Sequence, residues 1–491
     1  MHDPTPPNGA HPPHRAAALR TRRILFGSLQ IAGGQGANQL ISFARNLLIA
    51  RLIGPEQFGL GLTFVLIVAF VEMAGDLSWQ KFIVQDPEGD QPKTQATLHL
   101  FLALRGLLLG AALLLGAEAL IWVLGVSPDL AWAYRVLALV PVLSSLTHLD
   151  VKRFHRQLRY GPDVATQCVG NIAGLVAGVT AAFTLDDYRA LLIAVVVRYL
   201  GQVITSHMLA EWPYRFRYSR AVALRAWRFG WPLMINGVVL FASSQGDRAV
   251  VVRAFGVAAF GVYGAVSIVT QAITTLVLTV TGSIGLPIMS GKQNAPAEFA
   301  AAYDRLGSIT TLTAVVVGVP MFAVLPGLIP VLYGADFEVP RMLVTLLAAV
   351  VVLVVMRNWP TIASLSLGNT GIVMWQTVSR ASGIAFAVLV VTLGGDLVDV
   401  AAALLVGEAL ATVVIFTMLR SAYGFALDRA AVLLGIATAT MIACIAVEWL
   451  WGGALVALTF YPLILAAALA ALYLASADVR GLARNLKAAV Q

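Results

Sequence analysis

The residues of this sequence that could do chemistry are charged side chains inside long apolar segments. Arginines stand at Arg105, Arg198, Arg357 and Arg380, each surrounded in sequence by apolar residues. A charged group at the bilayer centre costs about 2.5–3.5 kcal/mol on insertion scales, so each one needs a compensating role. A guanidinium group stays charged and matches phosphate oxygens bidentately. We therefore predict that these four arginines line a cavity that binds an anion from the cytoplasmic side.

Depth separates the four arginines into two pairs. Arg105 and Arg380 lie about eight residues, or ~12 Å, from the start of their segments. At that depth a long side chain can instead extend its charge to the lipid headgroups. Arg198 and Arg357 lie deeper in their segments, which favours an aqueous cavity around them.

Two carboxylates form a second candidate group. Glu72 and Asp76 are four residues apart in one predicted helix, so they share a face. They could bind a coupling Na⁺ or carry a proton, or they could neutralise Arg105 on the next helix as a structural pair. We predict no bound cofactor or metal, and the choice between Na⁺ and H⁺ coupling stays open.

The chain also repeats itself once, with an offset of 202 residues. The first copy runs from Ala50 to Gly61 and the second from Val252 to Tyr263. The offset aligns Arg51 with Arg253, Gly54 with Gly256, Phe58 with Phe260, and Gly59 with Gly261. Two similar helical halves with a site between them are typical of secondary transporters.

The same offset brings two further charges to equivalent positions, Arg45 in the first half and Asp247 in the second. An ion pair between them, beside Arg248, would act as a latch on the outer gate that breaks when the cavity opens outward. The alternative is that each is paired within its own half or lies at the membrane interface.

The elements that must position these residues are membrane helices. The sequence has 491 residues, of which 59% are hydrophobic and 12% charged, and its mean hydropathy is +0.83. A soluble protein would have about a quarter of its residues charged, so the bilayer is the solvent for most of this chain. The net charge of +8 comes without a basic, aromatic-rich stripe, which excludes nucleic acid as a partner.

With ~20 apolar residues per span, the sequence predicts fourteen transmembrane helices. They are Ile24–Ala50, Phe58–Phe82, Leu98–Leu124, Leu130–Leu149, Val164–Thr184, Ala190–Ala210, Phe229–Val252, Phe260–Met289, Leu306–Leu332, Met342–Leu367, Ile372–Leu393, Val398–Leu419, Ala430–Trp451 and Ala454–Leu474.

Loop charges give the orientation. The links after the fourth and sixth helices are rich in arginine, and the links after the fifth, ninth and eleventh are acidic. Basic links mark the cytoplasmic side, so we expect a multi-pass protein of the bacterial inner membrane with both termini cytoplasmic. Six helices separate the two copies, so the halves are predicted to form parallel repeats.

These observations predict an all-α integral membrane protein with two six-helix bundles and two extra helices. We expect a disordered cytoplasmic tail at 1–23, bundles at 24–210 and 229–419, a cytoplasmic interfacial linker at 211–228, two further spans at 430–474, and a cytoplasmic tail at 475–491.

Several of these segments resemble bacterial oligosaccharide flippases, the polysaccharide transporter (Wzx-type) family. The run from Phe43 to Gly59 looks like its first-helix signature, and Asp76 with the nearby Phe82–Gln85 also fits. In the second half, Asp247-Arg248 and Phe255–Tyr263 resemble the corresponding motif, and Leu286–Ser290 the end of the eighth helix. The resemblance departs at Leu77-Ser78-Trp79, where the family usually has Leu-Gly-Leu.

The resemblance implies both a superfamily and an activity. The family shares a superfamily with multidrug and toxin extrusion antiporters and lipid II flippases. Its members are thought to move undecaprenyl-pyrophosphate-linked oligosaccharides from the cytoplasmic to the periplasmic leaflet by alternating access, for O-antigen, capsule or exopolysaccharide assembly. A polysaccharide polymerase and an initiating glycosyltransferase are partners that the family context implies. The last two helices would help to shelter the lipid tail.

Two rival functions remain open at this point. A cation-coupled drug antiporter of the same superfamily would need an acidic cavity, whereas the predicted spans contain six arginines and five acids. A membrane glycosyltransferase or polymerase would usually need a sizeable periplasmic loop with catalytic groups, and the sequence contains no such loop and no catalytic motif. We therefore predict a transporter rather than an enzyme.

Overall fold

The computed structural model describes residues 13–425 and 427–490, and within them every regular element is a helix. The helices are α1 (Pro13–Ala74), α2 (Trp79–Gln85), α3 (Pro92–Leu124), η1 (Pro128–Leu130), α4 (Ala131–Val136), α5 (Leu139–Ser145), α6 (Asp150–Arg153), η2 (Phe154–Gln157), α7 (Gly161–Leu185), α8 (Arg189–Leu209), α9 (Arg220–Ser290), α10 (Pro296–Tyr333), α11 (Arg341–Ser366), α12 (Thr370–Thr392), α13 (Leu397–Tyr423), α14 (Leu427–Trp451), α15 (Ala454–Ala475) and α16 (Ala477–Val490).

The two longest helices, α1 and α9, each contain a sharp break at a repeated glycine. Gly54 has φ 73° and ψ 171°, and Gly256 has φ 80° and ψ 178°. A positive φ of this kind favours glycine because a Cβ would be strained there. The predicted loops at these two positions are therefore single-residue breaks, and each long helix crosses the membrane twice.

Counted in this way, the described residues agree with the predicted number of spans. Ten helices are long and apolar enough to cross a membrane, or twelve if each of two bent pairs is one span. Counting both arms of α1 and of α9 raises the twelve to fourteen. The all-helical, two-repeat architecture predicted from the sequence is confirmed.

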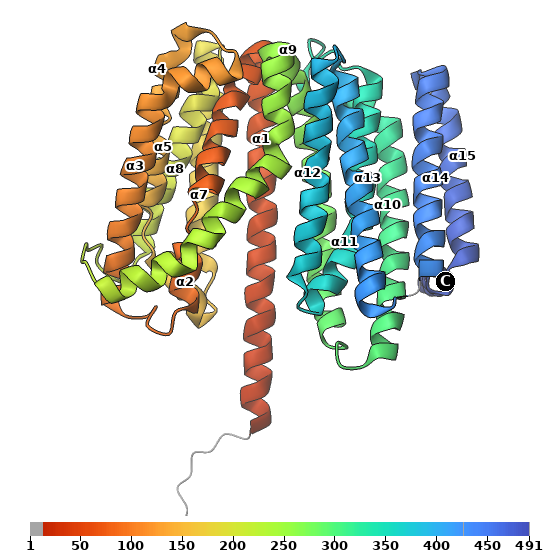
Figure 1. The fold of residues 1–491 in the computed structure, drawn as a ribbon, viewed down its shortest axis with the longest axis horizontal. Coiled ribbons are helices and arrows are strands. Elements are labelled where there is room, and N and C mark those ends of the chain that lie inside the picture. Colours follow the sequence, from red (N-terminus) through yellow and green to blue (C-terminus); the bar gives the residue numbers. More distant parts are fainter. Residues whose placement is uncertain (1–12, 426, 491) are drawn as a thin grey trace, which may run out of the picture.

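The helices form two lobes with the extra pair at one edge. Figure 1 shows α3, α5, α7 and α8 in the first lobe, α10 to α13 in the second, and α1 and α9 between them. In the same view α14 and α15 lie beyond the second lobe. An ion pair from the half-buried Arg341 of α11 to the buried Glu448 of α14, with an N–O distance of 2.6 Å, ties this pair to the second lobe.

The predicted fourth helix is not continuous. It is divided into α4 and α5, and a 49° bend separates Pro128–Ser145 from Asp150–Gln157, which follows the predicted end. Pro141 explains the first interruption, because its ring nitrogen cannot donate to the carbonyl of Leu137 four residues earlier. The prediction of one helix over Leu130–Leu149 was therefore wrong in its continuity.

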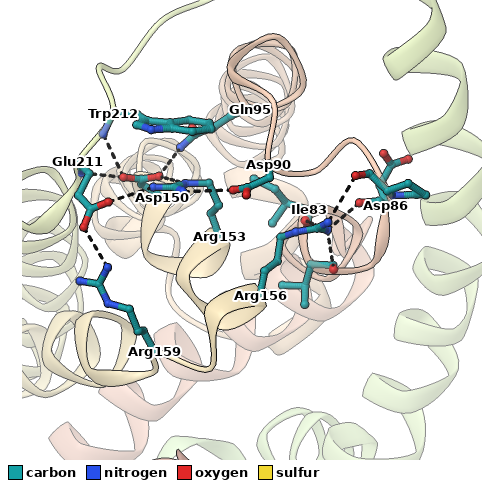
Figure 2. Close-up of polar contacts among 12 residues, drawn as sticks. Ile83, Asp86, Asp90, Gln95, Asp150, Arg153, Arg156, Arg159, Glu211 and Trp212 are labelled. Atoms are coloured by element: carbon teal, nitrogen blue, oxygen red, sulfur yellow. Dashed lines mark hydrogen bonds and ion pairs between the residues drawn. The ribbon is translucent and has the colours of Figure 1, made fainter. Parts of the chain in front are cut away.

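The connection between the lobes is fixed to the first lobe. The Asp150 carboxylate accepts hydrogen bonds from the backbone N–H groups of Glu211 at 2.6 Å and Trp212 at 3.0 Å (Figure 2). The Arg153 guanidinium lies 3.9 Å from the Trp212 ring centroid. Tyr214 stacks on His99 at 4.1 Å, and burial raises the pKa of Tyr214 to about 12. The first part of the linker is thus an irregular segment that is held against the first lobe. Helix α9 begins at Arg220, inside the linker expected at 211–228.

The two chain ends differ from the predicted tails. Of the tail expected at 1–23, residues 1–12 lie outside the described residues, and the chain is helical from Pro13. The tail expected at 475–491 contains α16, which turns by 108° from the direction of α15. Arg429 at the start of α14 pairs with Asp478 of α16 at 2.6 Å.

Candidate functional site

A cavity of about 490 Å³ lies inside the first lobe, on the side of the basic loops. Its wall comes from α1, α2, α3, α5, α6, α7 and α8, and from the first arm of α9. Four predicted site residues line it: Glu72, Asp76, Arg105 and Arg198. Lys81, which is exposed, also belongs to the lining and marks its mouth.

Tyr199 joins two of these residues. Its hydroxyl donates to the Glu72 carboxylate and accepts from the Arg198 guanidinium at 3.0 Å, and its side chain is only 2% exposed. The Nε of Arg198 is buried without a partner. The sequence analysis missed Tyr199; the signal that could have found it is a phenol directly after a deep arginine in an otherwise apolar helix.

Arg105 lies opposite this group, on α3. It interacts electrostatically with Asp76 and Glu72, and its Nε is buried without a partner. Asp76 itself accepts from the backbone N–H of Ser78 at 2.7 Å and from the Ser78 hydroxyl at 3.0 Å. Asp76 therefore stabilises the turn between α1 and α2 as well as facing the cavity.

The predicted Arg45–Asp247 pair is not formed in this structure. Arg45 bonds to the side chain of Asn46 at 3.4 Å, whereas Asp247 accepts from the Tyr263 hydroxyl at 2.5 Å. Arg248 donates to Gln271 at 3.1 Å. Each group thus finds a neutral partner in its own lobe. Equivalent positions in a repeat have equal depth in the two lobes, but they need not face each other.

Arg45 instead lies near Arg198, within the first lobe. It is 4% exposed, it interacts electrostatically with Arg198 and Tyr199, and its Nη1 has no hydrogen-bond partner.

The other two predicted arginines lie in the second lobe. Arg357 on α11 and Arg380 on α12 both pair with Glu408 on α13, with N–O distances of 3.1 and 2.9 Å. Arg357 is 9% exposed and Glu408 is 4% exposed. The four arginines therefore divide between the lobes instead of sharing the lining of one cavity, because each half packs around its own inner helices. Glu408 holds the second pair together.

The lobes meet at the repeated motif, on the side away from the basic loops. A Cβ on Gly59 would lie 1.8 Å from the Val257 carbonyl oxygen, and a Cβ on Gly261 would lie 1.9 Å from the Pro55 carbonyl oxygen. The two backbones are therefore in direct contact, which only glycine permits. We call this the glycine contact.

The repeated arginines reach across the same interface. Arg51 donates to the Val331 and Leu332 carbonyl oxygens at 3.0 and 3.3 Å, at the end of α10 in the other lobe. Arg253 lies against Gly125, at the end of α3 in the first lobe. Each arginine thus contacts the equivalent helix end in the opposite lobe, where helix carbonyls attract cations.

Two apolar hollows lie beyond the cavity. The first, of about 810 Å³, lies between α1 and the second arm of α9 and shares Gln167 with the cavity lining. The second, of about 780 Å³, lies on α9, α10 and α16 and shares Leu276 and Val280 with the first. Lys292 and Arg305 belong to the lining of the second hollow. The cavity and the first hollow therefore neighbour each other at Gln167, and the two hollows neighbour each other on α9.

Comparison of the sequence with known proteins identifies its family. A family model described as polysaccharide biosynthesis protein matches residues 48–341, which is more than half of the chain. The chain belongs to this family. It is also similar to the succinoglycan biosynthesis transport protein ExoT of Rhizobium meliloti (strain 1021), at 23% identity over 245 residues. That match covers 50% of this chain and 48% of the relative, so the chain spans about half the length of the curated relative it matches.

Solved structures show the same fold. The inward closed conformation of the lipid II flippase MurJ matches with a TM-score of 0.69 and 12% identity, covering 90% of this chain and 98% of the other. The inward-facing conformation of a multidrug resistance MATE family transporter of the MOP superfamily matches with a TM-score of 0.64 and 16% identity, covering 79% and 94%. The family member described here therefore has the fold of MurJ and of the MATE transporters.

Proposed function

We propose that this protein flips undecaprenyl-diphosphate-linked oligosaccharide repeat units from the cytoplasmic to the periplasmic leaflet of the bacterial inner membrane. The product would feed O-antigen, capsule or exopolysaccharide assembly, with a polymerase and an initiating glycosyltransferase as partners. Both chain termini are taken as cytoplasmic, as the basic loops predict.

One observation carries the proposal: the inner cavity holds two arginines that each have a free nitrogen. Arg105 and Arg198 line the cavity, and the Nε of each is buried without a hydrogen-bond partner. Guanidinium donors with no partner are suited to phosphate oxygens. A carrier of cationic drugs would instead be expected to leave carboxylates free, but here Glu72 and Asp76 are already hydrogen-bonded.

The apolar hollows provide a place for the lipid. A polyprenyl chain must stay in an apolar environment while its sugar occupies a polar cavity. The hollow between α1 and α9 and the hollow beside α10 and α16 supply such an environment. In this proposal the tail lies in these hollows, and the last helices shelter it.

The two-lobe construction supports alternating access as the mechanism of this proposal. The glycine contact holds the outer side together while the cavity extends toward the basic loops. Rocking of the lobes would separate Gly59 from Gly261 and open the cavity outward. Glu72 and Asp76 are the proposed coupling groups, because a proton or Na⁺ on either would free Arg105 to bind the substrate.

The proposal is tested in a strain that lacks the gene, complemented with variants. Arg105→Ala and Arg198→Ala should each accumulate the completed lipid-linked repeat unit and reduce surface polymer at normal protein levels. Arg135→Ala is the matched control, because Arg135 pairs with Glu118 on the exposed surface of the same lobe. Wild-type levels of surface polymer in both cavity variants would contradict the proposal. Unchanged lipid-linked intermediates in the deletion strain would favour a drug or ion antiporter.

A further inference from the structure

The first arm of α9 is shared between the two lobes. Its inner segment, residues 220–241, lies on the first lobe, where a Cβ on Gly237 would lie 1.9 Å from the Met73 carbonyl oxygen of α1. Further along the same arm, Gly246 packs against the Ile384 side chain of α12 in the second lobe. Figure 1 shows the arm running obliquely from the first lobe to the centre of the molecule. The inner and outer parts of one helix thus contact different lobes.

The equivalent arm of α1 does not cross in this way. Gly34 of α1 packs against Val164 of α7, which belongs to the same lobe. Figure 1 shows α1 standing upright between the lobes. The two halves are repeats of each other, so α1 illustrates a second position for the inner segment of α9, beside its own lobe.

The residues between the two parts of the α9 arm provide a pivot. The hydroxyls of Ser243 and Ser244 both donate to the Leu240 carbonyl oxygen, at 3.1 and 2.6 Å. Serine hydroxyls that bond back to the preceding turn compete with the helical hydrogen bond and favour bending. At the two equivalent positions, α1 has Ile41 and Ser42. The double serine therefore marks α9 as the arm that can bend here.

Two ion pairs and one hydrogen bond hold the inner segment on the first lobe. Arg225 pairs with Asp86 at 3.0 Å and with Glu88 at 2.6 Å, in the loop after α2. The Nε1 of the buried Trp79 donates to the Ala226 carbonyl oxygen at 3.2 Å. Ion pairs that water reaches are weak, so these contacts can break and form again during a transport cycle.

Trp79 is also a point at which this chain departs from the usual Leu-Gly-Leu. A leucine could not donate a hydrogen bond, so the tryptophan adds a bond to α9. Ser78, at the glycine position, has a φ of 50°, and its N–H and hydroxyl donate to Asp76 at 2.7 and 3.0 Å. The departure from the family pattern thus fastens the inner segment to the first lobe.

With the segment in this position, the second lobe does not reach the cavity. Leu233, Asn236 and Leu240 of the segment line the cavity, and no residue of α10 to α13 belongs to the described lining. The volume of about 490 Å³ lies in the lower half of the range of about 300–1,000 Å³ for small-molecule sites. A cargo with several sugars needs more space, which movement of this wall would supply.

We propose that residues 220–241 form a side lid, which swings about Ser243 and Ser244 from the first lobe to the second. The closed lid leaves space for a lipid diphosphate and one sugar, whereas the open lid joins the cavity to the space between the lobes. Arg225 and Trp79 keep the lid closed. The inference rests on the proposed function only for the size of the cargo.

Distances between spin labels test the lid without any ligand. The experiment uses the full-length protein in lipid nanodiscs, with Cys168→Ser and Cys444→Ser. One label is attached at the exposed Arg228 of the segment. A second label at the exposed Lys93 gives the first-lobe distance, and one at the exposed Gln293 gives the second-lobe distance.

Arg225→Glu and Trp79→Leu each weaken the closure. Each should enlarge the fraction of molecules in which the first-lobe distance is longer, and the second-lobe distance shorter, by one helix diameter, ~10 Å. Adding Glu88→Arg to Arg225→Glu should restore the closed fraction. Arg135→Glu is the control, because Arg135 pairs with Glu118 on the exposed surface of the first lobe.

Unchanged distances in both lid variants would overturn the lid. Thermal unfolding identifies any variant that is not folded. Trp79→Phe, which keeps an aromatic ring but lacks the donor, then takes the place of Trp79→Leu, and Arg225→Gln that of Arg225→Glu.

A cleavable cross-link tests what the lid admits. Asp86→Cys with Arg225→Cys, joined by a short disulfide-containing reagent, holds the segment on the first lobe. The locked protein should still bind farnesyl diphosphate N-acetylglucosamine, but should bind the corresponding chitotetraose compound at least tenfold more weakly, and reduction should restore binding. Glu118→Cys with Arg135→Cys, joined in the same way, should change neither affinity.

The two measurements separate this inference from the proposed function. Chitotetraose binding that is unchanged by the cross-link would overturn the lid and leave a lipid-linked substrate intact. Failure of the unlinked protein to bind either compound would remove the proposed function, and the spin-label distances would still decide whether the segment moves.

Discussion

At the scale of single residues, the deep arginines differ in what surrounds them. Arg198 has a phenol beside it and Arg105 has two carboxylates nearby, while Arg357 and Arg380 share one acid. Two of the four are therefore available to a ligand in the cavity, and two are already engaged. The type of residue alone does not distinguish these cases, since all four are arginines in apolar segments.

Tyr199→Phe tests the link between Arg198 and Glu72. The change removes a hydroxyl that both groups contact, leaves the ring volume in place, and deprives the Glu72 carboxylate of a donor. We expect a loss of about 1–3 kcal/mol in the free energy of unfolding and a several-fold fall in transport. Tyr218→Phe is the control because Tyr218 is 63% exposed. Thermal unfolding and a transport assay measure both effects, and equal behaviour of the two variants would show that the Tyr199 hydroxyl is dispensable.

At the scale of helices, the repeated glycines act in pairs. Gly54 and Gly256 let α1 and α9 reverse direction, and Gly59 and Gly261 let the lobes touch. Gly54 and Gly256 adopt a positive φ that strains other residues. At Gly59 and Gly261 a side chain would collide with the opposite backbone.

Gly59→Ala should weaken closure of the outer side. The added Cβ would lie 1.8 Å from a backbone oxygen, so the two helices must move apart. We expect the population to shift toward the outward-open state. A cysteine at Tyr333, which is 1% exposed here, should then react faster with a membrane-impermeant maleimide in a background without Cys168 and Cys444.

Gly116→Ala is the matched control for this experiment, because nothing lies within 4 Å of a Cβ at Gly116. It should leave the labelling rate at the parent value. A slower or unchanged rate in Gly59→Ala would mean that the glycine contact does not limit opening.

The linker is a second test at this scale. Asp150→Asn keeps the size of the side chain but weakens the charge-assisted bonds to Glu211 and Trp212 and the ion pair with Arg153 (Figure 2). We expect about 2–4 kcal/mol lower stability and faster proteolysis between residues 211 and 219. Asp129→Asn, at an exposed turn, is the control. Resistance of the linker in Asp150→Asn would show that these bonds do not hold it.

The fold was largely predictable at this scale, and the site was not. Long apolar runs determine the spans, and the 202-residue offset determines the two repeats. The breaks at Gly54 and Gly256 were expected only as loops, since a one-residue reversal depends on backbone angles. The division of the arginines between lobes depends on packing between distant segments, such as α11 against α13, which no local pattern reports.

At the scale of the whole molecule, the glycine contact determines which side of the protein is closed in this structure. The lobes touch on the side away from the basic loops, whereas the polar cavity lies on the side of those loops.

The glycine contact also bears on ancestry. Gly59 and Gly261 meet the opposite backbone in the same way, so the interface is that of two like patches related by a twofold axis. A half-length ancestor with this motif once would have made the same contact with a second copy of itself. Duplication and fusion of such a gene would then have required no new interface, because the same glycine would have made the contact in both copies of the ancestral dimer.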